Sequence, residues 1–282
     1  MIFYIENEYL KLGVKDMGAE LTSLVSKSTG REYIWYGKAD IWYGQSPILF
    51  PVIGQLLDGK YRLDGREYSM PKHGIVRKKP FILTEKADSS LTFLQTADDE
   101  SMSMYPYRFR LYVTFELKNR ALTVTHRVEN DNDRVMFFSI GAHPGWNCKL
   151  GDKLRFPHKQ TISTERIDSD SILIDRRFPL LDNEDAITIT KEIFEPDALI
   201  LSGYTDREIT LDGGDFSVRF DYGDAPVLGI WAKPGAPYVC IEPWFGINDS
   251  RDKKADISEK RGILSLPARD SYLFTWSAEV SE

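Results

Sequence analysis

Apolar and polar residues alternate along much of the chain, and a period of two is typical of β-strands with one buried face. The alternation is clear over residues 111–117, stops at Lys118-Asn119-Arg120, and resumes over residues 122–128. A polar run, Asn130-Asp131-Asn132-Asp133, follows. The pattern predicts a β-hairpin and then a second turn.

Further short segments rich in aromatic and β-branched residues lie between turn signals such as Asp212-Gly213-Gly214. These segments are residues 91–94, 135–140, 187–189, 209–211, 216–220, 227–231, 238–241 and 272–276. No amphipathic segment of helical length is convincing, so helix is expected only as single turns near residues 40–43 and 191–195. Residues 47–51, bounded by two prolines, are expected to be extended and buried.

These features predict an all-β protein, a sandwich of large antiparallel sheets with very little helix. The 282 residues contain no internal repeat, low-complexity tract or Gly/Ser linker. A large all-β architecture can use a chain of this length as one unit. We therefore expect residues 1–282 to form a single domain.

Charge narrows the classes of partner. With 36 Lys and Arg against 43 Asp and Glu, the net charge is −7, which opposes binding to nucleic acid and to anionic membranes. No apolar run approaches the ~18–20 residues that span a bilayer, and Glu6 and Glu8 do not suit a signal peptide. We expect a cytoplasmic protein in which Cys148 and Cys240 are free thiols.

Several catalytic chemistries find little support in the sequence. The four histidines, His73, His126, His143 and His158, show no metal-binding spacing, and there is no CxxC or GxSxG motif. The sequence therefore predicts no metal site, no cofactor and no covalent nucleophile. His126 and His158 are interpreted as structural residues.

Three segments place a titratable residue beside Gly, Pro and aromatic residues: residues 73–77, 141–147 and 241–246. Each has a structural alternative. His143 can be a hydrogen-bonded core histidine at a strand end, and Glu242 can point either to solvent or into a pocket. Trp146 and Trp244 can simply cap the core, which is the usual place of tryptophan.

One reaction would use these residues together. A cyclic sugar hemiacetal opens when a base removes the anomeric hydroxyl proton while an acid protonates the ring oxygen, and rotation before reclosure inverts the anomeric centre. The reaction needs one carboxylate and one imidazole, and Glu242 and His143 are the candidates. The faces of Trp146 and Trp244 would pack on the sugar, while Arg, Asp and His side chains would bind its hydroxyls.

At these residues the sequence resembles the aldose 1-epimerase (galactose mutarotase) family, and most closely its bacterial branch with HGFAR and EPW segments. The resemblance spans essentially the whole chain. It is carried by residues 20–24, 47–51 with Gly54, 73–77, 141–145, 195–198 and 242–246. It implies a galactose mutarotase-like β-supersandwich that binds a small-molecule sugar in a cleft on one sheet.

The resemblance also implies individual roles. Glu242 would be the general base, His143 the general acid, His73 a second histidine that holds or polarises the sugar, and Asp197 a ligand of a sugar hydroxyl. The best-known galactose-active members carry an arginine in the segment corresponding to residues 54–59, and here there is none. Galactose preference is therefore open.

Arg77 is the candidate to supply the missing cation, and related hexose-6-phosphate epimerases look similar there, with arginines on the phosphate. Three functions remain: an aldose 1-epimerase, a hexose-6-phosphate 1-epimerase, and a non-catalytic carbohydrate-binding protein of the same fold.

Overall fold

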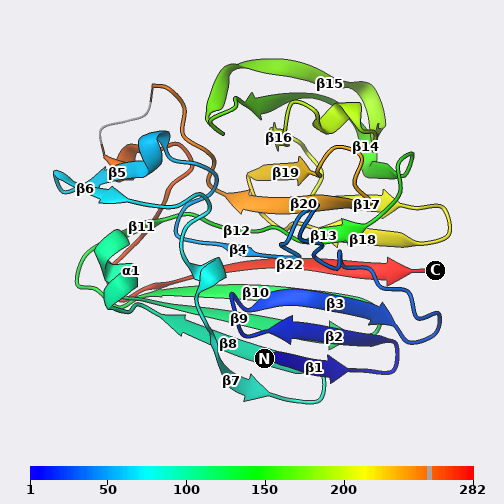
Figure 1. Ribbon diagram of the computed structural model, residues 1–282, viewed down its shortest axis with the longest axis horizontal. Coiled ribbons are helices and arrows are strands. Elements are labelled where there is room, and N and C mark those ends of the chain that lie inside the picture. Colours follow the sequence, from blue (N-terminus) through cyan, green and yellow to red (C-terminus); the bar gives the residue numbers. More distant parts are fainter. Residues whose placement is uncertain (253–255) are drawn as a thin grey trace.

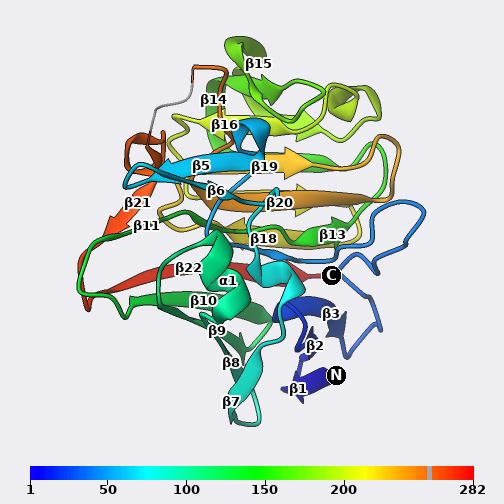
Figure 2. The same cartoon turned by 60° about the vertical axis from the view of Figure 1, so that its left-hand side comes forward.

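The structure is a computed structural model, and it describes residues 1–252 and 256–282. About 54% of the chain is strand and about 6% is helix, which confirms the predicted all-β class. Most strands belong to one 15-stranded sheet whose neighbours are antiparallel. In Figures 1 and 2, β22 runs through the middle of this sheet, with β10 to β7 on one side of it and β18 to β15 on the other.

The path through the large sheet is β4-β12-β20-β19-β16-β14-β17-β18-β22-β10-β9-β8-β7, with β13 paired to β20 and β15 paired to β14. The bounds are β4 (Ile48–Leu49), β7 (Ile82–Lys86), β8 (Ser90–Thr96), β9 (Phe109–Lys118), β10 (Ala121–Asn130), β12 (Ile140–Ala142), β13 (Gly145–Asn147), β14 (Lys153–Ile167), β15 (Leu173–Thr188), β16 (Leu199–Ser202), β17 (Glu208–Asp212), β18 (Ser217–Asp221), β19 (Val227–Trp231), β20 (Tyr238–Phe245) and β22 (Ser271–Ser281).

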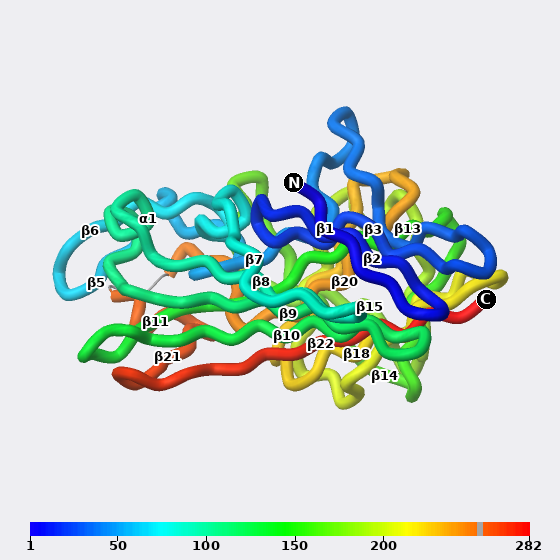
Figure 3. The backbone as a smooth tube through the Cα atoms, turned by 90° about the horizontal axis from the view of Figure 1, so that it is seen from below, coloured from blue at the N-terminus to red at the C-terminus, as the bar shows by residue number. Residues whose placement is uncertain are grey.

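A three-stranded sheet forms a second layer beside β7 to β10, as Figure 3 shows. Its strands are β1 (Ile2–Glu6), β2 (Leu10–Lys15) and β3 (Glu20–Ser26). The rings of Phe3 and Phe93 meet edge to face between the two sheets, with centroids 5.6 Å apart. The remaining elements are the pairs β5 (Lys60–Leu63) with β6 (Arg66–Ser69) and β11 (Met136–Phe138) with β21 (Leu264–Leu266), the helix α1 (Asp99–Met104), and the 3₁₀ turns η1 (Leu57–Gly59), η2 (Val76–Lys78), η3 (Glu192–Phe194) and η4 (Ile257–Glu259).

The predicted hairpin is confirmed as β9 and β10, which pair from Lys118↔Ala121 to Phe109↔Asn130. Buried and less buried residues alternate along both strands, because each contributes one face to the core. The 3₁₀ turn expected near residues 191–195 is η3, and β4 confirms a buried extended segment within residues 47–51. Near residues 40–43 no helix forms; residues 39–41 are a turn closed by the bridge Lys38↔Trp42.

Residues 135–140 do not form the single strand that was predicted. The chain leaves β11, which pairs with β21, and enters β12, which pairs with β20 and β4. The change of partner occurs at Ser139, whose N–H donates to the carbonyl of Pro51. Both parts are apolar, so periodicity gave no sign of the change.

Two further sequence expectations concern the thiols and the membrane. Cys148 and Cys240 are both buried and free, as predicted. Within the described residues, no helix is long and apolar enough to cross a membrane.

Candidate active site

A cavity of about 620 Å³ lies against the part of the large sheet formed by β16, β19 and β20. Six of the seven residues that the sequence suggested for a site line this cavity: His73, Arg77, His143, Asp197, Glu242 and Trp244. They come from four separate parts of the chain. The seventh residue, Trp146, does not line it.

Strand register brings Glu242 and His143 together. Gly141 pairs with Trp244 and Gly145 pairs with Cys240, so the connection between β12 and β13 carries His143 past Glu242. Nε2 of His143 lies 3.2 Å from Oε2 of Glu242. Both side chains are almost fully buried, with exposed fractions of 10% and 1%. An imidazole and a carboxyl group therefore share one buried corner of the cavity.

Trp244 completes this corner because its neighbours are glycines. Its Nε1–H donates to Oε2 of Glu242 over 3.2 Å. A Cβ atom on Gly229 would lie 2.6 Å from the indole ring, and one on Gly141 would lie 3.0 Å from it. These two glycines thus provide the space in which the indole reaches Glu242. Trp244 and His143 both contact Oε2, which leaves Oε1 available to a bound molecule.

His73 is held by a backbone arrangement that only glycine permits at the next position. Gly74 has φ +76°, and a Cβ atom there would lie 2.0 Å from the carbonyl oxygen of Phe50. The N–H of Gly54 donates to Nδ1 of His73 over 3.2 Å. Because Nδ1 accepts this hydrogen bond, neutral His73 carries its proton on Nε2, where it can donate to a ligand.

Burial dominates the titration of the site. It raises the pKa of Glu242 well above its usual value, against the lowering effects of the Trp244 hydrogen bond and the charge of Lys72. The pKa of His143 is lowered to about 3, mainly by burial, with smaller contributions from the charges of Arg77 and Lys72 and against the raising effect of a backbone hydrogen bond. Burial also lowers the pKa of His73 well below its usual value. The Glu242 and His143 pair therefore holds one proton between its members over a wide pH range.

Aromatic rings that the sequence analysis did not select form a wall of the cavity. Trp42 stacks on His143 with ring centroids 5.0 Å apart, and Trp231 meets the same imidazole edge to face at 5.8 Å. His73 meets it at 5.8 Å from another side. His143 is therefore fixed between three rings. The sequence pattern predicts a helical turn near residues 40–43 and gives no sign that Trp42 contacts His143.

Charged residues form another part of the cavity wall. Asp197, with φ +68°, accepts a hydrogen bond from its neighbour Ala198 through Oδ1. Nη2 of Arg77 donates to the carbonyl of Lys72, whereas its buried Nε has no hydrogen-bond partner in the described chain. Lys72 itself donates to Oγ of Ser171 over 2.9 Å. Cations and carboxylates thus face one cavity.

The expectation for Trp146 is wrong. Trp146 pairs with Val239, one residue away from Cys240, so its side chain lies on the opposite face of the sheet from Glu242. It is fully buried, and its ring packs edge to face on Phe220 at 5.9 Å. It is a core residue.

The structure also brings His143 close to Cys240, about one hundred residues later in the chain, as well as to Glu242. One ligand atom each from His143, Cys240 and Glu242 lie within 4.8 Å of one another, and all three residues are buried. Histidine spacing along the chain had suggested no metal site. It could not reveal this group, because the ligands come from different segments.

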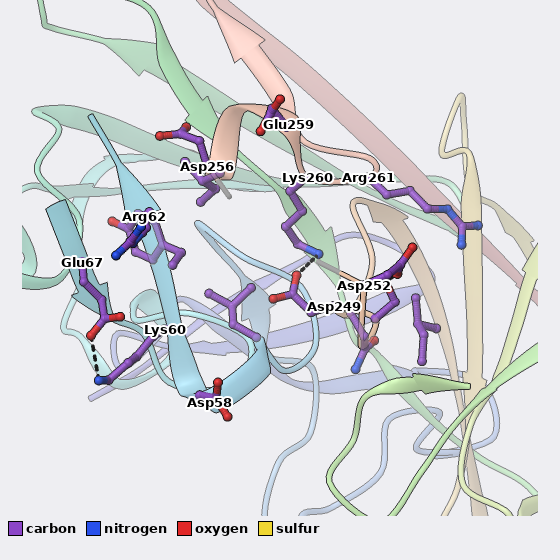
Figure 4. Close-up of a pocket in the computed structure, with 16 residues that line it drawn as sticks. Asp58, Lys60, Arg62, Glu67, Asp249, Asp252, Asp256, Glu259, Lys260 and Arg261 are labelled. Carbon is purple, nitrogen blue, oxygen red and sulfur yellow. Dashed lines mark hydrogen bonds and ion pairs between the residues drawn. The ribbon is translucent and has the colours of Figure 1, made fainter. Parts of the chain in front are cut away.

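A second cavity of about 610 Å³ lies between the β5–β6 pair and η4 (Figure 4). Its charged residues form ion pairs: Lys260 with Asp249 at 2.9 Å, and Lys60 with Glu67 at 2.7 Å. Arg261, also in its wall, pairs with Glu165. None of its described lining residues is a histidine or a cysteine. We therefore take the first cavity as the candidate active site.

Known proteins resemble this chain in sequence and in fold. The family model described as aldose 1-epimerase matches residues 1–241, and so ends one residue before Glu242. The chain is 32% identical to the chromosomal protein LacX of Lactococcus lactis subsp. lactis, over 96% of each chain. It is similar to a galactose mutarotase related enzyme from Lactobacillus acidophilus (30% identity, TM-score 0.94, 100% of this chain and 98% of that one). A galactose mutarotase-like protein from Lactobacillus casei superimposes with TM-score 0.95 at 29% identity, over 100% of both chains.

Proposed function

This chain belongs to the aldose 1-epimerase family, and from that premise we propose that it interconverts the α and β anomers of an aldohexose or a derivative. Glu242 acts as general base and His143 as general acid. The observation that carries the proposal is the 3.2 Å contact between these two buried groups at the wall of a cavity large enough for a sugar.

The chemistry needs two groups that act on one carbon. The step starts with the shared proton of the pair on His143. The Glu242 carboxylate then removes the proton of the anomeric hydroxyl, the carbonyl forms at C1, and the bond from C1 to the ring oxygen breaks. His143 donates its proton to the departing ring oxygen. Both oxygens are attached to C1, so an acid and a base at adjacent positions can reach them.

Reclosure reverses these transfers. Rotation about the bond between C1 and C2 presents the other face of the carbonyl to the ring hydroxyl. Imidazole then removes the hydroxyl proton while the protonated carboxyl group returns its proton to the carbonyl oxygen. The pair begins and ends with one proton, in keeping with the single proton that burial favours there. No cofactor takes part in this sequence.

Neighbouring groups bind and orient the sugar. Trp244 and Trp231 present aromatic surface suited to the apolar face of a pyranose. Nε2–H of His73 and the carboxylate of Asp197 offer a donor and an acceptor for hydroxyls. Each acid or base group contributes roughly 10²–10⁴-fold to the rate when it reaches its proton.

Polarimetry tests the proposal. Freshly dissolved α-glucose or α-galactose should relax to the anomeric equilibrium faster with the protein than without it. An unchanged relaxation rate for every aldohexose and sugar phosphate tried would contradict the proposal. Calorimetric sugar binding without faster relaxation would instead identify a carbohydrate-binding protein.

A second candidate is a 1-epimerase of hexose 6-phosphates. The observation that favours it is the set of cations at this cavity: Lys15, Lys72, Arg77 and Lys78. Lys15 already pairs with Glu20 at 2.5 Å, whereas the buried Nε of Arg77 has no partner in the described chain. Phosphate is the anion that such a guanidinium binds well.

Comparing glucose with glucose 6-phosphate decides between the candidates. A preference for the phosphate that falls about tenfold or more in Arg77→Met, with the rate on glucose retained, would support the second. Equal rates on the two substrates, or a preference that survives in Arg77→Met, would count against it.

A further inference from the structure

His143, Cys240 and Glu242 form a compact group of nitrogen, sulfur and oxygen ligands. Cys240 and Glu242 are two residues apart on β20, so their side chains share one face of the strand. Gly145, the partner of Cys240, begins β13 two residues after His143. The register that builds the acid and base pair therefore also puts a thiol beside it.

The dimensions suit a tetrahedral metal ion. Zinc binds imidazole nitrogen and carboxylate oxygen at about 2.0–2.2 Å, which separates two ligands of a tetrahedron by about 3.3 Å. The distance between Nε2 of His143 and Oε2 of Glu242 is 3.2 Å. The third ligand atom lies within 4.8 Å of the others, a separation that side-chain rotation can reduce.

The side chains of this group are all buried. Cys240 is a free thiol with no exposed surface. A thiolate and a carboxylate are costly to bury alone, but a divalent cation would balance their two negative charges.

The ligand types select the class of metal. Thiolate and imidazole favour borderline-soft ions such as Zn²⁺, whereas Mg²⁺ and Ca²⁺ require sets of oxygen ligands. His143 and Glu242 line the cavity, so a cation can reach them from the side by which a sugar would enter. A cation held by Glu242 would occupy the group that the sugar needs as its base.

We propose that His143, Cys240 and Glu242 form a binding site for a divalent cation of the Zn²⁺ class, and that this cation and the sugar exclude each other. The binding site stands on the geometry alone. The exclusion rests on the proposed function, because it requires Glu242 and His143 to act on the sugar. Zn²⁺ would accordingly act as a reversible inhibitor.

Cobalt(II) is the direct probe, because it occupies zinc sites and reports its ligands by absorption. Titration of the metal-free wild-type protein with Co²⁺ should produce a thiolate-to-cobalt charge-transfer band and the intense visible bands of a tetrahedral ion, and Zn²⁺ should abolish both. Absence of the thiolate band would overturn the proposal without any variant. Equal competition by Mg²⁺ would overturn it as well.

Two cysteine variants locate the site. Cys240→Ser should lose the thiolate band and bind Zn²⁺ at least about tenfold more weakly. Loss of a residue that only hydrogen-bonds to a metal ligand already lowers metal affinity by about tenfold or more, and loss of a ligand should cost at least as much. Cys148→Ser is the matched control, because Cys148 is the other buried free thiol and lies outside the group. Loss of the band in Cys148→Ser, with retention in Cys240→Ser, would overturn the assignment. Cys240→Ala replaces the serine variant if circular dichroism shows that the latter is unfolded.

Kinetics test the exclusion separately. Zn²⁺ should slow anomer interconversion and EDTA should restore it. In Cys240→Ser, whatever its metal-free rate, added Zn²⁺ should slow the reaction much less than it slows the wild type. Zn²⁺ binding that leaves the wild-type rate unchanged would overturn the exclusion. A thiolate band in a protein that accelerates no anomerisation would support the metal site and contradict the proposed function.

Discussion

The two cavities have almost the same volume, about 620 and 610 Å³, but the buried carboxyl groups Glu242 and Asp249 in their walls have different partners. In the second cavity, Lys260 and Asp249 satisfy each other at 2.9 Å, and Lys260 also donates to the carbonyl of Ile247. In the first, Glu242 meets a neutral imidazole and an indole N–H, and no cation among the described residues pairs with it directly.

Cavity size alone therefore does not identify a catalytic site. Direct ion pairs stabilise the ionised forms of both partners and so lock their protonation states. A buried carboxyl group beside an imidazole keeps a proton that can move to either partner. Proton transfer is therefore available in the first cavity, whereas the second holds segments of the chain together.

Replacing the base gives the largest expected effect. Glu242→Gln preserves the size of the side chain but cannot accept a proton, and we expect anomer interconversion to fall by about 10²–10⁴-fold. Polarimetry with fresh α-glucose measures the loss. Glu259→Gln, in the wall of the second cavity, is the matched control and should keep the wild-type rate. Similar losses in both variants would erase the distinction between the cavities.

Breaking the buried ion pair should cost stability. Lys260→Met leaves Asp249 as a buried carboxylate without its cation, and we expect the free energy of unfolding to fall by about 3–5 kcal/mol in urea titrations. The double variant Asp249→Leu with Lys260→Met should recover much of this loss. A single variant as stable as wild type would show that the pair has no structural role.

Crowding the indole should have an intermediate effect. In Gly229→Ala the new methyl group meets the Trp244 ring at 2.6 Å, so the indole must move away from Glu242. Overpacking of this kind costs about 1–3 kcal/mol, and we expect kcat/KM to fall about tenfold. Steady-state kinetics combined with thermal unfolding separates the two effects. An unchanged kcat/KM would mean that the Trp244 hydrogen bond is dispensable.

The smallest effect is expected at the rim of the second cavity. Asp58 is exposed with φ +60°, a conformation that asparagine also tolerates. Asp58→Asn should change the free energy of unfolding by less than about 0.5 kcal/mol and leave the anomerisation rate unaltered. A clear loss of activity would assign the second cavity a part in catalysis.

The sequence predicted the fold where alternation is strong and missed it where alternation is absent. β9 and β10 bury one face each, so their period of two is visible. β15 is exposed along most of its 16 residues, and its pairing with β14 contains register shifts. When backbone hydrogen bonds hold a strand and its side chains are mostly exposed, the sequence shows no alternation of apolar and polar residues from which the strand could be predicted.

For the candidate site, the sequence identified residue types but not their placement. Glu242 and His143 stood out by their Gly and Pro neighbours, yet only the β12–β20 and β13–β20 registers bring them together. Trp146 was misassigned because a shift of one residue along a strand moves a side chain to the other face. Trp42 was missed because its position depends on a turn stabilised by long-range packing.

An open sheet of this width also has to avoid polymerising through its outer strands, two of which, β4 and β7, end the main path. At one end, β4 is only two residues long, which offers an incoming strand little backbone to pair with. At the other, β7 ends in the exposed, charged residues Glu85 and Lys86. Short edge strands and charged residues on an edge are the usual protection against edge-to-edge aggregation.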